Sequence, residues 1–141
     1  MCHMAPRKHR SFRFDPAILE RLEQRASASG LTVSALVEQY VDEGLRQEDH
    51  PGIVFVDGPA GRRARVGGTG LDVWEVIMVV QDNDGSPEEA AGWLHVPQRL
   101  VDNGVRYYAD YPYEIDHWLA ETDRLYEEEL QRQRRVADVS R

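Results

Sequence analysis

The sequence predicts a mainly α-helical protein with short strands, in which a small N-terminal unit precedes a helical unit that carries a short β-hairpin. Three observations lead to this fold class. Apolar residues recur three and four positions apart over most of the chain, which is the spacing of one helix face. Short alternating or β-branched runs occur at only a few places. The polar stretch 46–52 ends in Pro-Gly and separates the two units.

Charge is distributed unevenly along the chain. The 141 residues carry a net charge of −8, which argues against nucleic-acid binding by the whole surface. Residues 7–13, "RKHRSFR", contain four basic residues and no acid, whereas residues 113–130 are mostly acidic. This asymmetry is typical of a basic arm for nucleic acid and an acidic end that is solvated or meets a basic protein.

Several classes of protein are disfavoured by the composition. No apolar run is long enough to span a bilayer, and residues 1–13 lack the apolar core of a signal peptide. The single cysteine, Cys2, cannot form an internal disulfide, which indicates a reducing compartment. We therefore expect a cytoplasmic protein with no membrane partner.

The N-terminal unit reads as one strand and two helices. Residues 11–14, "SFRF", alternate polar and aromatic side chains as a strand with one buried side does. Asp15 and Pro16 suit the N-cap and first position of a helix, and Gly30 suits the left-handed residue after it. Thr32 caps the second helix. The predicted apolar stripes are Ile18, Leu19, Leu22 and Ala26, then Val33, Leu36, Val37, Tyr40, Val41 and Leu45.

This unit is too small to be self-sufficient. About forty residues is near the size below which a chain rarely builds its own core. A single strand also has no partner to pair with. Two copies would remove both deficits, because their strands pair as a ribbon and their helices interlock. The sequence therefore predicts an obligate homodimer.

The second unit begins with a hairpin and continues in helices. Ile53–Val56 and Ala64–Val66 are predicted strands about a Gly/Pro turn. Residues 71–80 fit either a strand or a helix, since Val and Ile favour a strand whereas Asp72 and Glu75 resemble a capping box. Ser86, Pro87 and Glu89 start a short helix. Further helices are predicted around Val101, Val105 and Tyr108, and from about Tyr113.

Residues 9–45 resemble a ribbon-helix-helix module of the CopG/Arc type. The resemblance lies in "RSFRF", "DPAILERLEQRA" and "SGLTVSALVEQYV" and in their spacing. It implies that paired strands enter the major groove of operator DNA, with Phe12 and Phe14 facing the helices. The implied DNA contacts are the outward strand residues His9, Ser11 and Arg13, and the start of the second helix at Thr32, Val33 and Ser34.

The chemistry of these residues fits DNA independently of the resemblance. Arg13 can make a bidentate contact to guanine, although ribbon-helix-helix proteins often carry a smaller polar residue there. Arg7, Lys8 and Arg10 would act mainly on phosphates. The alternative is a solvated basic terminus that precedes a helical hairpin serving only dimerisation.

Residues 67–117 resemble the small DUF433 family, a compact helical domain with a helix-turn-helix-like core. The matching stretches are "GGTGLDVWEVI", "NDGSPEEAAGWL" and "VRYYADYPYEID". "TGLD" and Asn103-Gly104 depart from the family pattern. The resemblance implies a role as the antitoxin-like partner of a small PIN-like nuclease toxin, whose active site combines carboxylates, Mg²⁺ and a basic rim.

Two groups of residues are candidates for contacting that partner. Arg62, Arg63 and Arg65 could insert among the toxin's carboxylates, while Tyr107, Tyr111 and Tyr113 are of a type favoured at interface hot spots. Each group has an ordinary explanation. Aromatic residues at helical spacing are often core, as expected for Tyr108 and Trp118, and "RRAR" could be a solvated turn or a second nucleic-acid contact.

We expect no enzyme activity, metal or cofactor. No Ser or Cys nucleophile lies near a plausible base in sequence, and the five histidines lack metal spacing. Asp82 and Asp84 in "QDNDG" lack the acidic twelfth residue of a calcium loop, since that position is Trp93.

The sequence thus predicts an antitoxin-type transcriptional regulator with residues 9–46 as the DNA-binding and dimerisation module, 47–52 as a linker and 53–131 as the partner-binding domain. Residues 1–8 and 132–141 are predicted to be flexible termini. Two alternatives stay open. One is a stand-alone regulator in which Arg99 and Arg106 add a second DNA contact, and the other is a purely structural dimerisation module.

Overall fold

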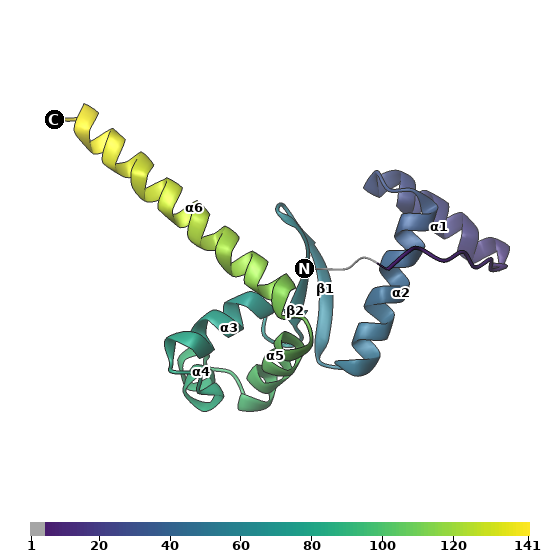
Figure 1. Cartoon of the computed structure of the whole chain (residues 1–141), viewed down its shortest axis with the longest axis horizontal. Helices are drawn as coiled ribbons and strands as arrows, with labels where there is room; N and C mark the ends of the chain where they lie inside the picture. Colours follow the sequence, from purple (N-terminus) through teal and green to yellow (C-terminus); the bar gives the residue numbers. More distant parts are fainter. Residues whose placement is uncertain (1–4) are drawn as a thin grey trace. The chain divides into compact units, whose positions relative to one another are not determined.

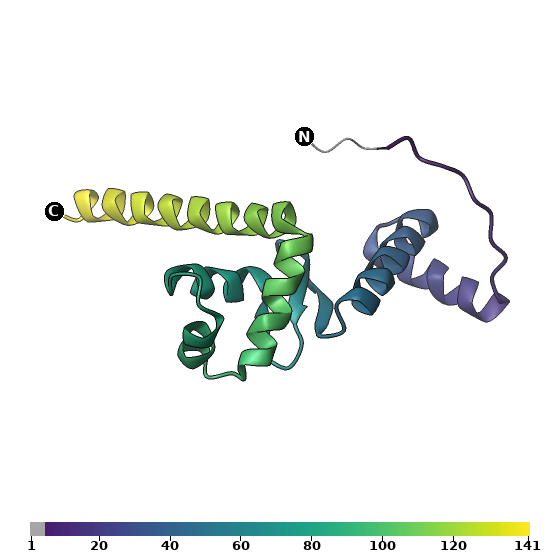
Figure 2. The ribbon, with the colours of Figure 1, turned by 60° about the horizontal axis from the view of Figure 1, so that its bottom comes forward.

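The chain is mainly helical with a small antiparallel sheet, as predicted (Figures 1 and 2). The computed structural model describes residues 5–141, so Cys2 and the first half of the predicted flexible stretch 1–8 lie outside the described residues. The described residues separate into two compact units, one up to Gly44 and one from Leu45. No helix within residues 5–141 is long and apolar enough to cross a membrane.

The first helix begins and ends at the predicted signals. Helix α1 spans Pro16–Ser29, and the Asp15 carboxylate accepts a hydrogen bond of 2.9 Å from the Ala17 N–H. This side chain therefore satisfies one of the N–H groups that a helix start leaves without a partner. Gly30 follows with φ +67°, a conformation that glycine adopts at little cost.

The second helix is longer than predicted. Helix α2 spans Val33–Asp49, and Thr32 Oγ1 accepts a hydrogen bond of 3.1 Å from the Ala35 N–H. The expected linker 47–52 is therefore wrong over its first half, which is helical. No glycine or proline interrupts the helix between Leu45 and Asp49, and Pro51 disfavours helix only at the residue before it.

The N-terminal unit buries few side chains. Among its described residues, Ala26 and Leu36 are the buried apolar ones, whereas Ile18 is 49% and Val41 56% exposed. Residues 5–14 form neither helix nor strand in the single chain. A strand needs a neighbouring strand to pair with. The predicted strand at 11–14 would form only when two chains pair, so it stays a prediction.

The C-terminal unit begins with a meander of three antiparallel strands. Strand β1 spans Ile53–Gly58 and β2 spans Gly61–Val66, with Phe55 opposite Ala64. Residues 59–60 connect them as a two-residue hairpin loop. A short third strand, β3 (Leu71–Asp72), opens the stretch for which strand and helix were both left open, and its Asp72 pairs with Arg65. The sheet therefore carries the chain directly into the next helix.

Four helices complete this unit, and the ambiguous stretch 71–80 is mostly helical. Helix α3 spans Val73–Asp82, because the Asp72 N–H donates to Glu75 Oε2 at 2.7 Å as a capping box requires. Ser86 Oγ similarly accepts from the Glu89 N–H at 3.2 Å to start α4. The remaining bounds are Pro87–Leu94 for α4, Gln98–Asp110 for α5 and Pro112–Val139 for α6.

The hydrophobic core of this unit lies where β1, β2, α3 and α5 meet. Its members include Ile53, Val66, Ile77 and Tyr107, each at most 2% exposed. Gly104 is part of this packing, since a Cβ there would lie 3.2 Å from Val66 Cγ2 and 3.3 Å from Val76 Cγ1. The glycine within α5 therefore lets the helix approach the sheet and α3 closely.

The C-terminus is helical where flexibility was expected. Helix α6 continues to Val139 and so covers most of the predicted flexible stretch 132–141. Good helix formers dominate this segment, and Arg124 and Arg132 pair with glutamates three and four residues away. Figure 2 shows the second half of α6 extending away from α3, α4 and α5.

Candidate nucleic-acid interface

The basic arm, residues 7–13, is exposed along its length. Its four cationic side chains are those nominated for DNA, namely Arg7, Lys8, Arg10 and Arg13. Arg7 lies 3.0 Å from Glu38 Oε2, but both side chains are more than half exposed, so this ion pair contributes little. His9 and Ser11 share a hydrogen bond of 2.9 Å. The arm thus presents polar and cationic groups that a polyanion can reach.

The arm and α2 together line a groove of about 660 Å³. Its apolar lining combines Phe12 and Phe14 with Val33, Val37 and Val41 of α2. Ser11 and Arg13 do not line it. Within residues 11–14 the two sides therefore differ as predicted, although Phe12 is still 69% exposed. His9, which was predicted to point outward with Ser11 and Arg13, lines the groove instead.

The start of α2 lies beside the arm. Val33 and Ser34 line the same groove as Arg7, Lys8, His9 and Arg10, while Thr32 caps the helix through its hydroxyl. The first turn of any helix carries N–H groups without helical partners, and these groups favour anions such as phosphate. The structure therefore brings most of the nominated DNA-binding residues into one region of the N-terminal unit.

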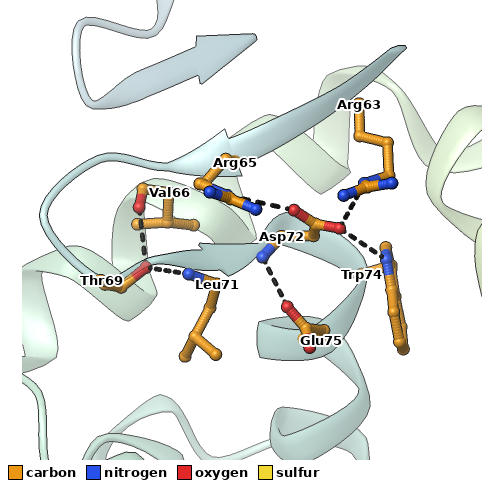
Figure 3. A network of polar contacts seen from close by, with 8 residues as sticks. All are labelled: Arg63, Arg65, Val66, Thr69, Leu71, Asp72, Trp74 and Glu75. Carbon is orange, nitrogen blue, oxygen red and sulfur yellow. Dashed lines mark hydrogen bonds and ion pairs between the residues drawn. The ribbon is translucent and has the colours of Figure 1, made fainter. Parts of the chain in front are cut away.

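The three arginines nominated for toxin contact already pair within the C-terminal unit. Arg62 lies 3.3 Å from Asp57 across the hairpin. Arg63 Nε lies 2.6 Å from Asp72 Oδ2, and Arg65 Nε donates to Asp72 Oδ1 at 3.2 Å (Figure 3). We therefore correct the expectation that Arg63 and Arg65 are available to a partner's carboxylates, because their own carboxylate holds them.

Asp72 is the centre of this network. Asp72 is 4% exposed. Its Oδ2 atom also accepts a hydrogen bond of 3.2 Å from Trp74 Nε1 (Figure 3). The Arg63 contact has a short distance but no hydrogen-bond geometry, so it is purely ionic. The carboxylate thus ties β2 to the start of α3. Sequence reasoning used Asp72 only as a cap, because strand register, which places it beside Arg63 and Arg65, is not visible in the sequence.

The nominated tyrosines separate into one core and two accessible residues. Tyr107 is 0% exposed, so its proposed role at an interface is wrong. Tyr111 is half-buried beneath the guanidinium of Arg46, 4.0 Å from its ring centre, and Tyr113 is 76% exposed. Tyr108, which was expected in the core, packs against its edge, is half-buried and donates to Asp116 at 2.7 Å.

The buried Tyr107 hydroxyl belongs to a polar cluster that sequence reasoning missed. Arg46 donates to Tyr107 Oη at 2.8 Å and to Glu114 Oε2 at 2.6 Å, and Tyr107 donates to Glu114 at 3.0 Å. Burial raises the pKa of the Tyr107 phenol, and the nearby Glu114 carboxylate raises it further. The cluster therefore keeps the phenol protonated, as a structural donor.

His50 forms a second buried contact in the stretch expected to be a linker. It is 9% exposed, and its Nε2 lies 2.7 Å from Asp110 Oδ2. Its ring also meets the edges of Tyr107 and Tyr111. Residues 46–50 therefore pack against α5 as part of the C-terminal unit. The signal available in the sequence was weak, because a polar stretch before Pro-Gly usually marks a loop.

Within residues 5–141, no group of three or more His, Cys, Asp or Glu side chains is placed to hold a metal ion. No protein-family model, curated protein or solved structure matches this chain.

Proposed function

We propose that the chain is a dimeric, antitoxin-type transcriptional regulator that binds its own operator through a β-ribbon and a small PIN-like nuclease toxin through its C-terminal unit. The observation that carries the proposal is the N-terminal unit itself. It joins a basic alternating arm to two helices that leave their apolar residues exposed.

Dimerisation is supported by the apolar surface of this unit. Phe12, Ile18, Leu31, Tyr40 and Val41 are each at least 40% exposed in the single chain. Burial of an apolar side chain of this size contributes roughly 1.5–3 kcal/mol, and a second copy offers the matching surface. The ribbon-helix-helix resemblance supplies the arrangement, in which the two arms pair as strands.

DNA binding is supported by the arm's charge and by the sides on which its residues lie. Pairing through residues 11–14 would bury Phe12 and Phe14 and leave Ser11 and Arg13 outward, next to Arg7, Lys8 and Arg10. A ribbon with this outer face matches the width of the major groove and the chemistry of base edges and phosphates.

The DNA proposal is tested by fluorescence anisotropy with a duplex from the region upstream of the gene and a random duplex of equal length. We expect Arg13→Ala to weaken binding to the upstream duplex by about 1–3 kcal/mol per half-site, the range for a bidentate base contact. Arg99→Ala is the matched control, since Arg99 is an exposed arginine on α5. Equal losses for both variants, or none for Arg13→Ala, would contradict the proposal.

Toxin binding is supported by the acidity of α6 and by exposed Tyr113, together with the DUF433 resemblance. It is tested by purifying the tagged chain from its native cells at high salt, which weakens contacts made through DNA. A stoichiometric small nuclease that is lost on Tyr113→Ala and retained on Trp93→Ala would support it. Trp93 is a suitable control because it is 73% exposed in the same unit.

A stand-alone regulator is the second candidate, and the polar networks favour it. Arg63, Arg65 and Tyr107 are occupied within the C-terminal unit, which leaves fewer residues for a toxin. Arg99 and Arg106 are both exposed on α5. A clean homodimer from the purification, combined with weaker DNA binding by Arg99→Ala, would identify this candidate.

A further inference from the structure

The second half of α6 presents apolar side chains that the C-terminal unit does not cover. Leu125 is 52%, Val136 59% and Val139 87% exposed. The first half of α6 packs on α3 and α5, and Figure 2 shows its second half leaving them. An isolated helix of this kind is marginal in water unless an apolar face is covered.

The exposed residues lie on one seam with heptad spacing. The seam is Thr122, Leu125, Glu129, Arg132, Val136 and Val139, separated by alternating steps of three and four residues. This spacing is that of the contact line of a two-stranded coiled coil, with apolar residues toward the two ends of the seam and a charged pair, Glu129 and Arg132, at its middle. Arg132, Val136 and Val139 also line a shallow groove of about 270 Å³ on the helix surface.

The charges along α6 change sign near the middle of this seam. Five acidic residues, Glu121, Asp123 and Glu127–Glu129, and the single arginine Arg124 precede the change. Arg132, Arg134 and Arg135 and the single acid Asp138 follow it. Two parallel helices would place Glu129 opposite Glu129 and Arg132 opposite Arg132. Two antiparallel helices would place each acidic half beside a basic half, so the charge pattern specifies one orientation.

We infer that α6 pairs with α6 of a second copy of this chain as an antiparallel two-helix coil. The seam is symmetric about the bond between Leu130 and Gln131. Leu125 therefore meets Val136 of the partner subunit, and Glu129 meets Arg132 of the partner subunit. Thr122 meets Val139 of the partner subunit.

The N-terminal end of the seam has room for the partner. Trp118, Thr122 and Leu125 border a hollow of about 410 Å³ that Arg63 and Asp72 also line. Val139 of the partner subunit, opposite Thr122, would lie next to this hollow. The contact is small, and it gains strength if the N-terminal units already hold two copies together, since pairing is then intramolecular. The pairing does not require DNA or toxin, although it uses acidic residues of α6 that also support toxin binding.

Cysteine cross-linking of the full chain tests this pairing. In a Cys2→Ser background, Leu125→Cys and Val136→Cys are combined in one chain. The two positions are about 16 Å apart along a single helix, too far for an internal disulfide. We expect a covalent dimer on mild oxidation, with residue 125 linked to residue 136 in the peptide map.

The single-cysteine variants are the matched controls. Antiparallel pairing leaves both as monomers on a non-reducing gel, because neither position lies near its own counterpart. Cross-linking of both single variants would show a parallel pair and overturn the inference. Absence of the 125–136 link in a chain with unchanged helix content by circular dichroism would also overturn it, and would leave α6 to a different partner.

Charge reversal provides a second measurement. Glu129→Arg places an arginine opposite Arg132 of the partner subunit, and symmetry repeats this contact once. Most of the cross-linked product should therefore be lost. Glu129→Arg combined with Arg132→Glu restores opposite charges in an antiparallel pair and should recover it. The same residues also pair within the helix at 3.3 Å, so helix content is measured for each variant. If the double variant does not recover cross-linking although its helix content is unchanged, the pairing of Glu129 with Arg132 of the partner subunit is contradicted.

Discussion

Residues up to Gly44 and residues from Leu45 bury apolar side chains to very different extents. Among the described residues, two buried apolar side chains, Ala26 and Leu36, belong to the first unit, whereas twelve form a continuous core in the second. Both units have regular helices with well-formed caps. Local sequence signals therefore produce secondary structure equally well in both units, but only the second encloses enough apolar surface to be stable by itself.

The difference also separates two kinds of exposed aromatic residue. Phe12 is 69% exposed and Trp93 73% exposed, so the single chain gives them the same environment. Phe12 nevertheless lies in an alternating stretch beside other uncovered apolar residues, while Trp93 is an isolated surface residue of a unit with its own core. Scattered exposed apolar residues are ordinary on protein surfaces, but contiguous ones indicate an interface.

The largest expected effect is that of Phe12→Ala. If a second copy buries this ring, its loss should cost about 3–5 kcal/mol of dimer stability, the range for a core phenylalanine. Trp93→Ala, the matched control, should change stability by less than about 0.5 kcal/mol. Chemical denaturation at several protein concentrations measures both. Equal, small effects would show that the N-terminal unit is not paired.

Ile77→Ala tests the core of the C-terminal unit in the same comparison. Ile77 is 2% exposed in the core of the C-terminal unit, so we expect a loss of about 2–5 kcal/mol. This loss should not depend on protein concentration, because the core lies within one chain. The same denaturation series measures it, and a concentration-dependent loss would mean that this unit also needs a partner.

Asp72→Ala should destabilise the C-terminal unit by about 1–3 kcal/mol, because it leaves the two arginines and the Trp74 N–H without their acceptor. This loss of stability is smaller than that expected for a fully buried ion pair, because the Arg65 side chain is 33% exposed. Asp72→Asn keeps an acceptor for Trp74 and should lose less. Thermal melts of both variants decide this, and an unchanged melting temperature for Asp72→Ala would show that the network is not stabilising.

The smallest effect concerns Tyr107 and alkaline pH. Its pKa is raised in the folded chain, so the protonated phenol is favoured by folding. The stabilising contribution is therefore fully present below the ordinary tyrosine pKa of about 10 and is lost as pH rises toward the higher folded pKa. The free energy of unfolding should fall above pH 10 in the wild type and fall less in Tyr107→Phe. Identical pH profiles would contradict the assignment.

Much of the fold could be predicted because it depends on local signals. Asp15, Gly30 and Ser86 mark helix ends in the sequence as they do in the structure. On α5 the sequence predicts Val101, Val105 and Tyr108 as the core positions, whereas the fully buried residues are Val101, Gly104 and Tyr107. Gly104 lies on the buried side although it has no apolar side chain. As a result, Tyr107 was assigned to an interface although it is buried, whereas Tyr108, expected in the core, packs against the edge of the core and is half-buried.

The candidate site was less predictable, because its residues meet through tertiary contacts. Nothing in "GRRARV" shows that Arg63 and Arg65 face a carboxylate, since that depends on the register of β2 with β3. Arg46 and His50 lie in a polar stretch that reads as a linker, yet both contact α5 or α6. The basic arm could be identified from sequence because its charge and alternation are contiguous.

The central claim is that residues 11–14 become a strand by pairing with a second copy, and amide hydrogen exchange of the full chain tests it most directly. We expect alternate amides of residues 11–14 to exchange slowly, as in an antiparallel ribbon, with protection that rises with protein concentration. The amides of Arg7 and Lys8, outside the paired stretch, serve as the control. If all amides from residue 7 to residue 14 exchange at the rate of an unstructured peptide at every concentration, the arm is not a ribbon strand.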